Sequence, residues 1–422
     1  MKIKNKPLSY AQVMALPREK RRKPRRPGRF FRWLLKTLSA GELKEVDFRL
    51  TRQGMDRLGP EEPALFLMNH SCFLDLKIAS AILYPRPFNI VCTSDGFVGK
   101  RWLMERLGCI PTQKFVSDPA LVRDMVYALK QLRSSVLLYP EASYSFDGTA
   151  TPLPDTLGKL LKLLKVPVVM IETKGAFLHD PLYNGLQLRK VPVRAEMRYL
   201  LSPRDIEEKP VAELNEILRE QFAFDGFRYQ RENGIRITEP FRADGLNRVL
   251  YKCPVCGAEG RMEGKGVRLT CGACGKVWTL NELGALEAED GDPLFDHVPD
   301  WYACERDEVK KEIENGAYRL DLPVQIRMLV DTKCLYTVRT GRLVHDGTGF
   351  TLTGCEGQLV YHQSPLASYS LYADYFWYEL GDMICIGDSK TLYYCFPLTG
   401  GDVVAKTRLA AEELYKLRMD RG

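Results

Sequence analysis

Residues 63–201 alternate between two spacings of apolar side chains. Short continuous apolar runs, such as residues 65–68 and 136–138, have the length and composition of buried strands. Between these runs, apolar residues recur three and four positions apart, as in residues 119–130, which is the period of a helix with one buried face. Strands that alternate with helices in this way predict an α/β domain with a mostly parallel sheet.

Individual elements of this region can be placed by their end signals. Asp118 and Pro119 stand directly before an apolar stripe, and both residue types favour the first positions of a helix. We expect helices near residues 74–82, 118–132, 157–164 and 211–222. We expect strands near residues 65–68, 88–93, 135–139, 166–172 and 193–201.

The pattern changes beyond about residue 300, where aromatic and β-branched residues gather around Asp-Gly and Gly-Asp turns. This composition predicts a small antiparallel β domain. Residues 301–320 are rich in charge, and we expect a solvated helix anchored by Trp301 and Tyr302. Residues 405–419 predict an amphipathic helix that closes the chain.

The chain of 422 residues is long enough for roughly two to four domains. We expect a basic, aromatic arm over residues 1–44, the α/β domain over 45–245, a cysteine-rich module over 246–285 and the β-rich domain over 286–422. The pattern of this last part assigns it no chemistry.

The net charge of +7 is concentrated in the first 36 residues. Residues 1–28 are basic and contain several prolines, so we expect them to be poorly ordered, whereas residues 29–38 mix aromatic and basic side chains as a membrane-surface helix does. A basic tail leading into a core helix and a nucleic-acid-binding arm are the alternatives. No apolar run of transmembrane length and no secretory signal is found, which predicts a cytoplasmic protein bound peripherally at the inner face of the membrane.

Four of the twelve cysteines form two Cys-x2-Cys pairs separated by fourteen residues: Cys253, Cys256, Cys271 and Cys274. Each pair is followed by a glycine, which allows the tight turn that directs two sulfurs at one ion. This spacing predicts a zinc ribbon with structural Zn²⁺ bound by four thiolates and no position open for water. Redox pairs and chance clustering are the alternatives.

Ribbons in other proteins often bind nucleic acid, which gives a rival interpretation of the basic arm and the cysteine module. The acidic residues 281–292 that follow the second pair would repel phosphate, so we consider nucleic acid an unlikely partner. We favour a structural spacer or a docking module, with acyl carrier protein or the membrane as the candidate partners.

His70 follows an apolar run that ends at Met68, and Asp75 lies five residues further on. Ligands of a parallel sheet bind at the carboxyl ends of its strands, where His70 is expected. A carboxylate in the first turns of the next helix can bind one imidazole nitrogen and leave the other free as a base. A structural histidine at a helix start is the alternative for this pair alone.

Three further segments extend this pattern. "NHSCFLD" resembles the Asn-His-x4-Asp signature of the glycerolipid acyltransferases, the family that includes 1-acylglycerol-3-phosphate acyltransferase. "GCIPTQKF", "YPEASYS" and "VPVVMI" resemble the later blocks of that family, in the same order, over residues 45–240. The resemblance implies transfer of an acyl group from acyl-CoA or acyl carrier protein to a lysophospholipid hydroxyl.

The resemblance also implies roles for residues. His70 would be the general base and Asp75 would orient it, with no covalent acyl-enzyme. Acceptor-binding positions carried over from the blocks are Glu141, Lys114, Ser143, Asn69 and Gly108.

This sequence departs from the family at two cationic positions. Lys114 replaces an arginine and loses its bidentate fork, and Tyr144 replaces another arginine and removes a charge. Lys100 or Arg101 could supply that missing charge. The acceptor expected is 1-acylglycerol-3-phosphate, giving phosphatidic acid; another lysophospholipid acceptor, or a non-catalytic zinc-dependent module that binds nucleic acid or protein, are the alternatives.

Overall fold

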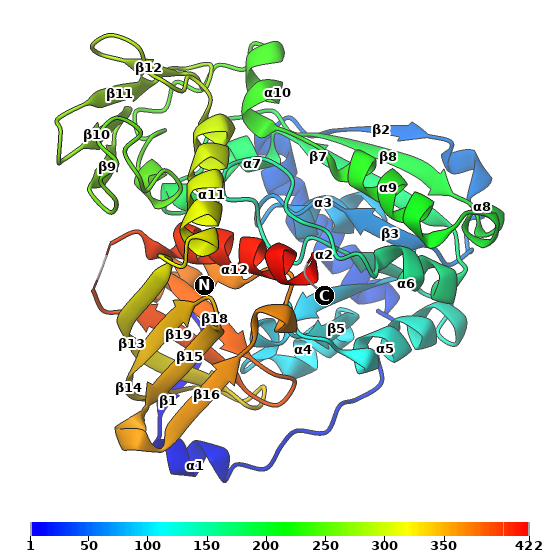
Figure 1. Cartoon of the computed structure of the whole chain (residues 1–422). Helices are drawn as coiled ribbons and strands as arrows, with labels where there is room; N and C mark the ends of the chain where they lie inside the picture. Colours follow the sequence, from blue (N-terminus) through cyan, green and yellow to red (C-terminus); the bar gives the residue numbers. More distant parts are fainter. Residues whose placement is uncertain (1, 400, 421–422) are drawn as a thin grey trace.

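Three sheets organise the chain in the computed structural model, which describes residues 2–399 and 401–420 (Figure 1). The first sheet has the strand order β2-β8-β7-β3-β6-β4-β5, and its neighbours are parallel except for β7 and β8. Its strands are β2 (Arg49–Gln53), β3 (Leu65–Met68), β4 (Phe88–Thr93), β5 (Cys109–Thr112), β6 (Ser135–Leu138), β7 (Val168–Lys174) and β8 (Arg194–Leu201). The predicted α/β domain with a mostly parallel sheet is confirmed.

Helices cover both faces of this sheet, which explains the continuous apolar runs. Phe66 and Met68 of β3 face one cluster of buried side chains, and Leu65 and Leu67 face the other. The helices of the first face are α2 (Arg29–Glu45), α3 (Asp75–Ile82) and α4 (Arg101–Arg106). Those of the second face are α5 (Pro119–Lys130), α6 (Leu157–Leu164), α8 (Pro203–Glu208) and α9 (Val211–Phe222).

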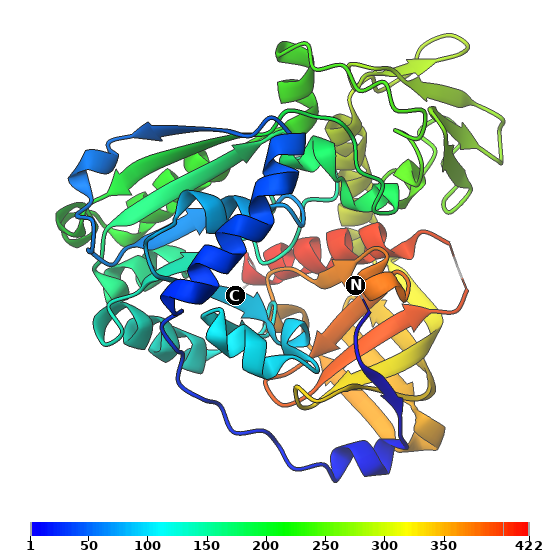
Figure 2. The ribbon, with the colours of Figure 1, turned by 180° about the vertical axis from the view of Figure 1, so that it is seen from behind.

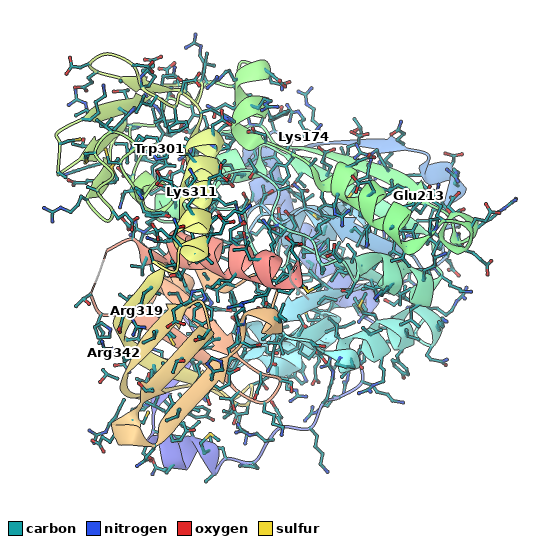
Figure 3. The ribbon with its side chains drawn as sticks, in the orientation of Figure 1. Lys174, Glu213, Trp301, Lys311, Arg319 and Arg342 are labelled. Carbon is teal, nitrogen blue, oxygen red and sulfur yellow. The ribbon has the colours of Figure 1, made fainter. Side chains whose placement is uncertain are left out.

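The second sheet belongs to the cysteine module and is antiparallel in the order β12-β11-β10-β9. Its strands are β9 (Met262–Lys265), β10 (Arg268–Cys271), β11 (Val277–Leu280) and β12 (Leu286–Ala288), so it extends past the boundary expected at residue 285. Trp278 of β11 packs against Trp301 of α11 (Val298–Glu314), with 5.0 Å between their ring centroids. Figure 3 labels Trp301 on α11. The short helices α7 (Ala176–His179) and α10 (Gly226–Glu232) contact each other.

The third sheet confirms the predicted antiparallel β domain, with the order β16-β15-β14-β13-β19-β18-β17. Its strands are β13 (Arg319–Leu329), β14 (Leu335–Asp346), β15 (Gly349–Gly354), β16 (Leu359–Gln363), β17 (Tyr372–Asp374), β18 (Met383–Gly387) and β19 (Leu392–Pro397).

The expectation that residues 1–28 are poorly ordered is wrong for the part the structure describes. β1 (Asn5–Pro7) pairs in parallel with residues 335–337 of β14, a stretch that β15 leaves unpaired, and α1 (Tyr10–Met14) follows. The chain then crosses to α2 on the α/β domain (Figure 2). Arg21 anchors this crossing with ion pairs of 2.7 Å to both Asp118 and Asp124, a geometry that the guanidinium fork allows.

The last helix, α12 (Val403–Met419), is buried over most of its length between the third sheet and the α/β domain (Figure 1). We expected an amphipathic helix with one wet face. Its charged residues are buried because they pair: Arg306 of α11 lies 2.7 Å from Glu412 and 2.9 Å from Glu413. Among the described residues, no helix has the length and hydropathy needed to cross a bilayer.

Candidate active site

His70 lies where the architecture predicts a ligand site, at the carboxyl end of β3. β6 pairs in parallel with β3, and β4 connects β6 to the outer strand β5, so all four strands have their carboxyl ends at the same end of the sheet. The loops that begin at Tyr139 after β6 and at Gln113 after β5 therefore lie at the same end as His70. α3 begins at Asp75 and directs its first turn at the same point.

Asp75 binds the His70 ring and its backbone neighbourhood through one oxygen. Its Oδ2 lies 2.9 Å from Nδ1 of His70 and also accepts backbone N–H groups from Ser71 at 2.7 Å and Cys72 at 3.2 Å. A carboxylate can only accept, so Nδ1 carries the proton and Nε2 is left as the basic nitrogen. Nε2 has no hydrogen-bond partner within the described part of the chain.

Glu141 shapes the loop around His70 rather than presenting a free carboxylate. One oxygen accepts the backbone N–H of His70 at 2.8 Å, and the other accepts the N–H of Thr151 at 2.9 Å and its hydroxyl at 3.2 Å. Burial raises the pKa of Glu141 to about 7, although these hydrogen bonds lower it. The side chain therefore connects the β6 loop directly to the backbone of the histidine.

Asn69 joins two strands and is buried. Its Oδ1 accepts the backbone N–H of Thr173 at 2.7 Å, and its Nδ2 donates to the carbonyl of Thr173 at 3.0 Å and to Ser71 Oγ at 3.3 Å. These contacts position the residue next to His70. They leave little of the amide available for an acceptor.

Two tyrosine rings enclose the imidazole. Tyr139 stacks on it at 4.2 Å between ring centroids with an interplanar angle of 24°, and Tyr144 lies at 4.1 Å and 38°. Phe73 packs at 5.4 Å against the Tyr144 ring. The rings hold the imidazole in one plane and limit the access of water to it.

Lys114 places a positive charge near the rings that enclose His70. Its Nζ lies 4.3 Å from the centroid of the Tyr372 ring and 5.7 Å from that of Tyr144. Burial lowers its pKa, and the acids Asp374 and Asp95 oppose that shift. Within the described residues Lys114 has no carboxylate at ion-pair distance, so it can bind an anion.

The charge of Lys114 predicts a measurable effect on His70. Burial lowers the pKa of His70 most, and Asp75 raises it. The positive charge of Lys114 lowers the pKa of His70 further. A Lys114→Met substitution removes a repulsive positive charge, so imidazolium becomes easier to form and the pKa must rise toward the ordinary value. Histidine NMR titration checks this, with the exposed Lys390→Met as control; an unchanged or lower His70 pKa would refute the electrostatic contact.

Of the two remaining predicted residues, Ser143 lies at the site and Gly108 does not. Ser143 is buried beside the site, with its Oγ 3.3 Å from Nη1 of Arg408. Gly108 precedes β5 and so lies at the amino-terminal end of that strand, away from the carboxyl ends where His70 lies. Its φ of +85° makes the turn into β5, and its carbonyl accepts a hydrogen bond from Asn89 Nδ2 at 2.8 Å. The structure therefore does not bring Gly108 together with His70, and its assignment as an acceptor-binding residue stays a prediction.

Arg101 does not replace the charge missing at Tyr144, because it pairs with Glu105 at 2.8 Å and with Glu19. Besides Lys114, a second cation, Arg408, lies next to Tyr144, and its Nη1 donates to the Tyr144 carbonyl at 3.1 Å. The sequence offered no signal for Arg408, which is distant in the chain. Tyr139 stands at the end of an apolar run in the sequence, a position that is typical of a core residue.

A cleft of about 1010 Å³ opens beside the site. Ser71 and Thr173 reach it from the strand ends, Phe146 and Phe177 give it apolar walls, and Tyr302 and Arg408 close it from α11 and α12. The cleft thus offers apolar surface and charged surface of both signs, and it reaches Ser71, the residue after His70.

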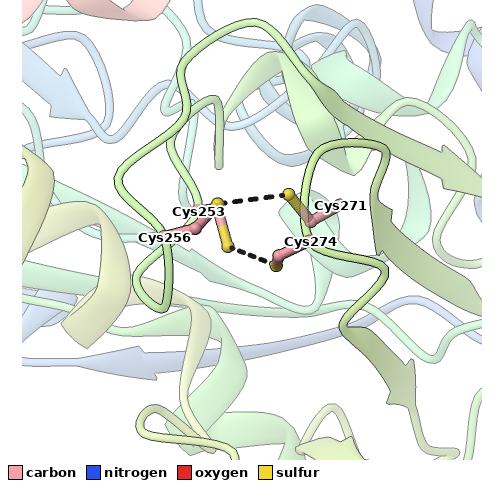
Figure 4. Close-up of side chains that lie close together, drawn as sticks. All are labelled: Cys253, Cys256, Cys271 and Cys274. Atoms are coloured by element: carbon pink, nitrogen blue, oxygen red, sulfur yellow. Dashed lines mark hydrogen bonds between the residues drawn. The ribbon is translucent and has the colours of Figure 1, made fainter.

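The four cysteines meet at one point (Figure 4), where all their sulfurs lie within 4.8 Å of one another. The distances from Cys253 to Cys274 and from Cys256 to Cys271 are 3.8 and 3.7 Å. Four thiolates about 2.3 Å from a zinc ion would be about 3.8 Å apart, whereas a disulfide needs about 2.0 Å. The cluster therefore fits a tetrahedral metal ion.

Comparisons with known proteins found a similar solved structure and a matching family model. Among solved structures, the 1-acyl-sn-glycerophosphate (LPA) acyltransferase PlsC from Thermotoga maritima is similar, with a TM-score of 0.36 and 13% identity over 45% of this chain and 78% of that chain. No curated protein sequence matches significantly. The sequence model of the Acyltransferase family matches residues 49–173, the segment that holds His70, Asp75, Lys114 and Glu141. The chain therefore contains an acyltransferase-family domain over residues 49–173.

Proposed function

We propose that this protein is an O-acyltransferase that moves a fatty acyl group from a thioester to the hydroxyl of a lysophospholipid. The observation that carries the proposal is the His70–Asp75 pair, with Nδ1 held at 2.9 Å and Nε2 free, inside an acyltransferase-family domain. General-base catalysis needs this arrangement of one bound and one available nitrogen.

The reaction follows from that geometry. Nε2 of His70 takes the proton of the acceptor hydroxyl as its oxygen attacks the thioester carbonyl. The new C–O bond forms, the C–S bond breaks, and the imidazolium returns the proton to the leaving thiolate. Asp75 stabilises the imidazolium between these two steps.

The acceptor class that the site favours is anionic, because Lys114 is a cation near Tyr144 and His70 with no ion-pair partner among the described residues. We propose 1-acylglycerol-3-phosphate, giving phosphatidic acid, with other lysophospholipids as the alternative. Acyl-CoA or acyl carrier protein would be the donor. The cleft beside Ser71 has room for an acyl chain and its thioester.

We further propose that the enzyme works on the surface of a membrane, at its cytoplasmic face. Phe30, Phe31, Trp33 and Trp102 form an aromatic patch in which Phe31 and Trp102 lie 6.5 Å apart. Phe30, Trp33 and Trp102 are at least half exposed, and α2, which carries most of the patch, packs against α3. Basic residues surround the patch, including Arg106, 5.0 Å from the Trp102 ring.

This membrane contact predicts that a Trp33→Ser/Trp102→Ser variant binds vesicles of phosphatidylglycerol and phosphatidylcholine at least about 10-fold more weakly, because two half-exposed aromatic rings can no longer enter the lipid. Vesicle sedimentation measures the effect. Val360→Ser, which removes an exposed apolar side chain from β16, should bind as wild type does. Equal binding by the tryptophan variant would exclude this face as the contact.

We propose structural Zn²⁺ for the cluster of Cys253, Cys256, Cys271 and Cys274. The fit of the sulfur positions supports it, and the cluster lies outside the domain that holds His70, so the metal takes no part in the chemistry. The domain limits expected from the sequence, 1–44, 45–245, 246–285 and 286–422, remain proposals of the same kind.

The experiment that tests the proposed function presents the full chain with labelled acyl-CoA and acyl carrier protein, each with a panel of lysophospholipids in vesicles. Formation of a diacyl phospholipid supports the proposal and identifies the acceptor. Folded, metal-loaded protein that transfers nothing in any combination would favour a binding module instead.

A further inference from the structure

The loop that encloses His70 needs support from outside its own domain. Residues 139–144 place Tyr139 and Tyr144 against the imidazole and Glu141 against its backbone. Ala142 within it has a φ of +54°, a left-handed conformation in which the Cβ of an alanine crowds the following carbonyl oxygen. Such a conformation persists only where the surroundings enforce it.

The α/β domain holds the first half of this loop and leaves the second half to another element. Thr151 binds Glu141, but no side chain of that domain outside the loop hydrogen-bonds to Ser143 or Tyr144 in the described structure. Arg408 of α12 does both: its Nη1 donates to Ser143 Oγ at 3.3 Å and to the Tyr144 carbonyl at 3.1 Å.

Arg408 is itself rigidly held. Its Nε donates to Glu412 at 3.2 Å, and its Cζ lies 4.5 Å from the centroid of the Phe146 ring. Glu412 in turn accepts the hydroxyl of Ser370 at 2.6 Å and pairs with Arg306 at 2.7 Å. The side chain of Arg408 is 4% exposed, so its position is fixed by the packing of α11, α12 and the third sheet.

A second contact from the C-terminal domain acts on the same loop. The hydroxyl of Tyr369 donates to the carbonyl of Pro140 at 3.4 Å, and its ring lies 5.3 Å from Phe115, next to Lys114. The loops after β5 and β6, which form two sides of the site, therefore both rest on the C-terminal domain.

We propose that Arg408 is a positioning residue for the reaction at His70. It ties the segment of Ser143 and Tyr144 to α12, and so keeps the Tyr144 ring on the imidazole and Glu141 on the His70 backbone. The C-terminal domain is then a part of the active site. The proposal rests on the proposed function for its kinetic consequences, whereas its structural consequence can be measured without turnover.

The test uses the full, zinc-loaded chain with Arg408→Gln, and Lys406→Gln as the matched control. Lys406 lies on the same helix but pairs with Glu259 and Glu312 instead of the loop. Arg408→Gln should accelerate amide hydrogen exchange in peptides covering residues 139–147 by about 10-fold, because it removes charge-assisted bonds to the loop. It should lower kcat by about 100-fold with the acceptor KM within about 3-fold of wild type. Lys406→Gln should change neither.

Two further variants keep the result decisive if Arg408→Gln does not fold. Arg408→Lys retains the pair with Glu412 but cannot supply the same fork, so it should show an intermediate increase in exchange. Ser143→Ala removes one acceptor on the loop and should act in the same direction. Wild-type exchange in all folded variants would overturn the proposal, as would a raised KM with unchanged kcat. If even the wild type transfers no acyl group, the proposed function fails and the exchange data alone decide the role of Arg408.

Discussion

A His70→Ala variant is expected to lose between about 10²- and 10⁴-fold in kcat while remaining folded. General-base catalysis contributes a factor of this size, and the substitution removes the imidazole that Asp75 orients. The fold should survive because Asp75 keeps its backbone hydrogen bonds from Ser71 and Cys72 after the ring is removed. Steady-state kinetics and thermal melting measure the two quantities.

The control for this substitution is His362→Ala. His362 lies on β16 in the third sheet, is exposed, and contacts Thr351 at 3.3 Å. It should leave kcat unchanged. Retention of most activity in His70→Ala would show that His70 is not the base, and a loss shared equally by both variants would point to a general effect of histidine removal.

The second large effect is expected from the cysteine cluster. A Cys253→Ser/Cys256→Ser variant should bind no stoichiometric zinc, and residues 250–290 should lose their exchange protection, because the binding free energy of a structural zinc site is on the order of 10 kcal/mol. The effect should spread to α11 and α12. Lys252 beside the first knuckle pairs with Glu308 at 2.9 Å, and Glu259 just after it pairs with Lys406 at 2.8 Å.

The matched control is Cys304→Ser, because Cys304 lies on α11 outside the cluster. Metal analysis should find wild-type zinc in this variant. Metal analysis of the wild type without zinc, or full exchange protection in the double variant, would contradict a structural zinc site.

The parts of the site predictable from sequence were those with local signals. Both faces of β3 are buried, so the strand is a continuous apolar run in the sequence. The run ends at Met68, and this predicted that His70 lies just after the strand. The spacing of His70 and Asp75 in the chain brings them together through the first turn of α3. The cysteine spacing predicted four sulfurs at one point in the same way.

The parts that could not be predicted depend on contacts between distant segments. The charges of α12 resemble those of a solvated helix, and the burial of Glu412 and Glu413 depends on partners that include Arg306 of another helix. The pairing of β1 with β14 likewise joins the start of the chain to its last domain. Gly108 was grouped with the site because its block resembles the family, whereas its place at the start of β5 depends on the direction of that strand in the sheet.

The central claim is acyl transfer based on His70, and mass-spectrometric detection of the diacyl product tests it most directly. Full-length wild type and His70→Ala are incubated side by side with 1-acylglycerol-3-phosphate and each thioester donor. The account predicts phosphatidic acid or another diacyl phospholipid from the wild type and its near absence from His70→Ala. Product formed equally by both proteins, or by neither with the whole acceptor panel, would contradict it.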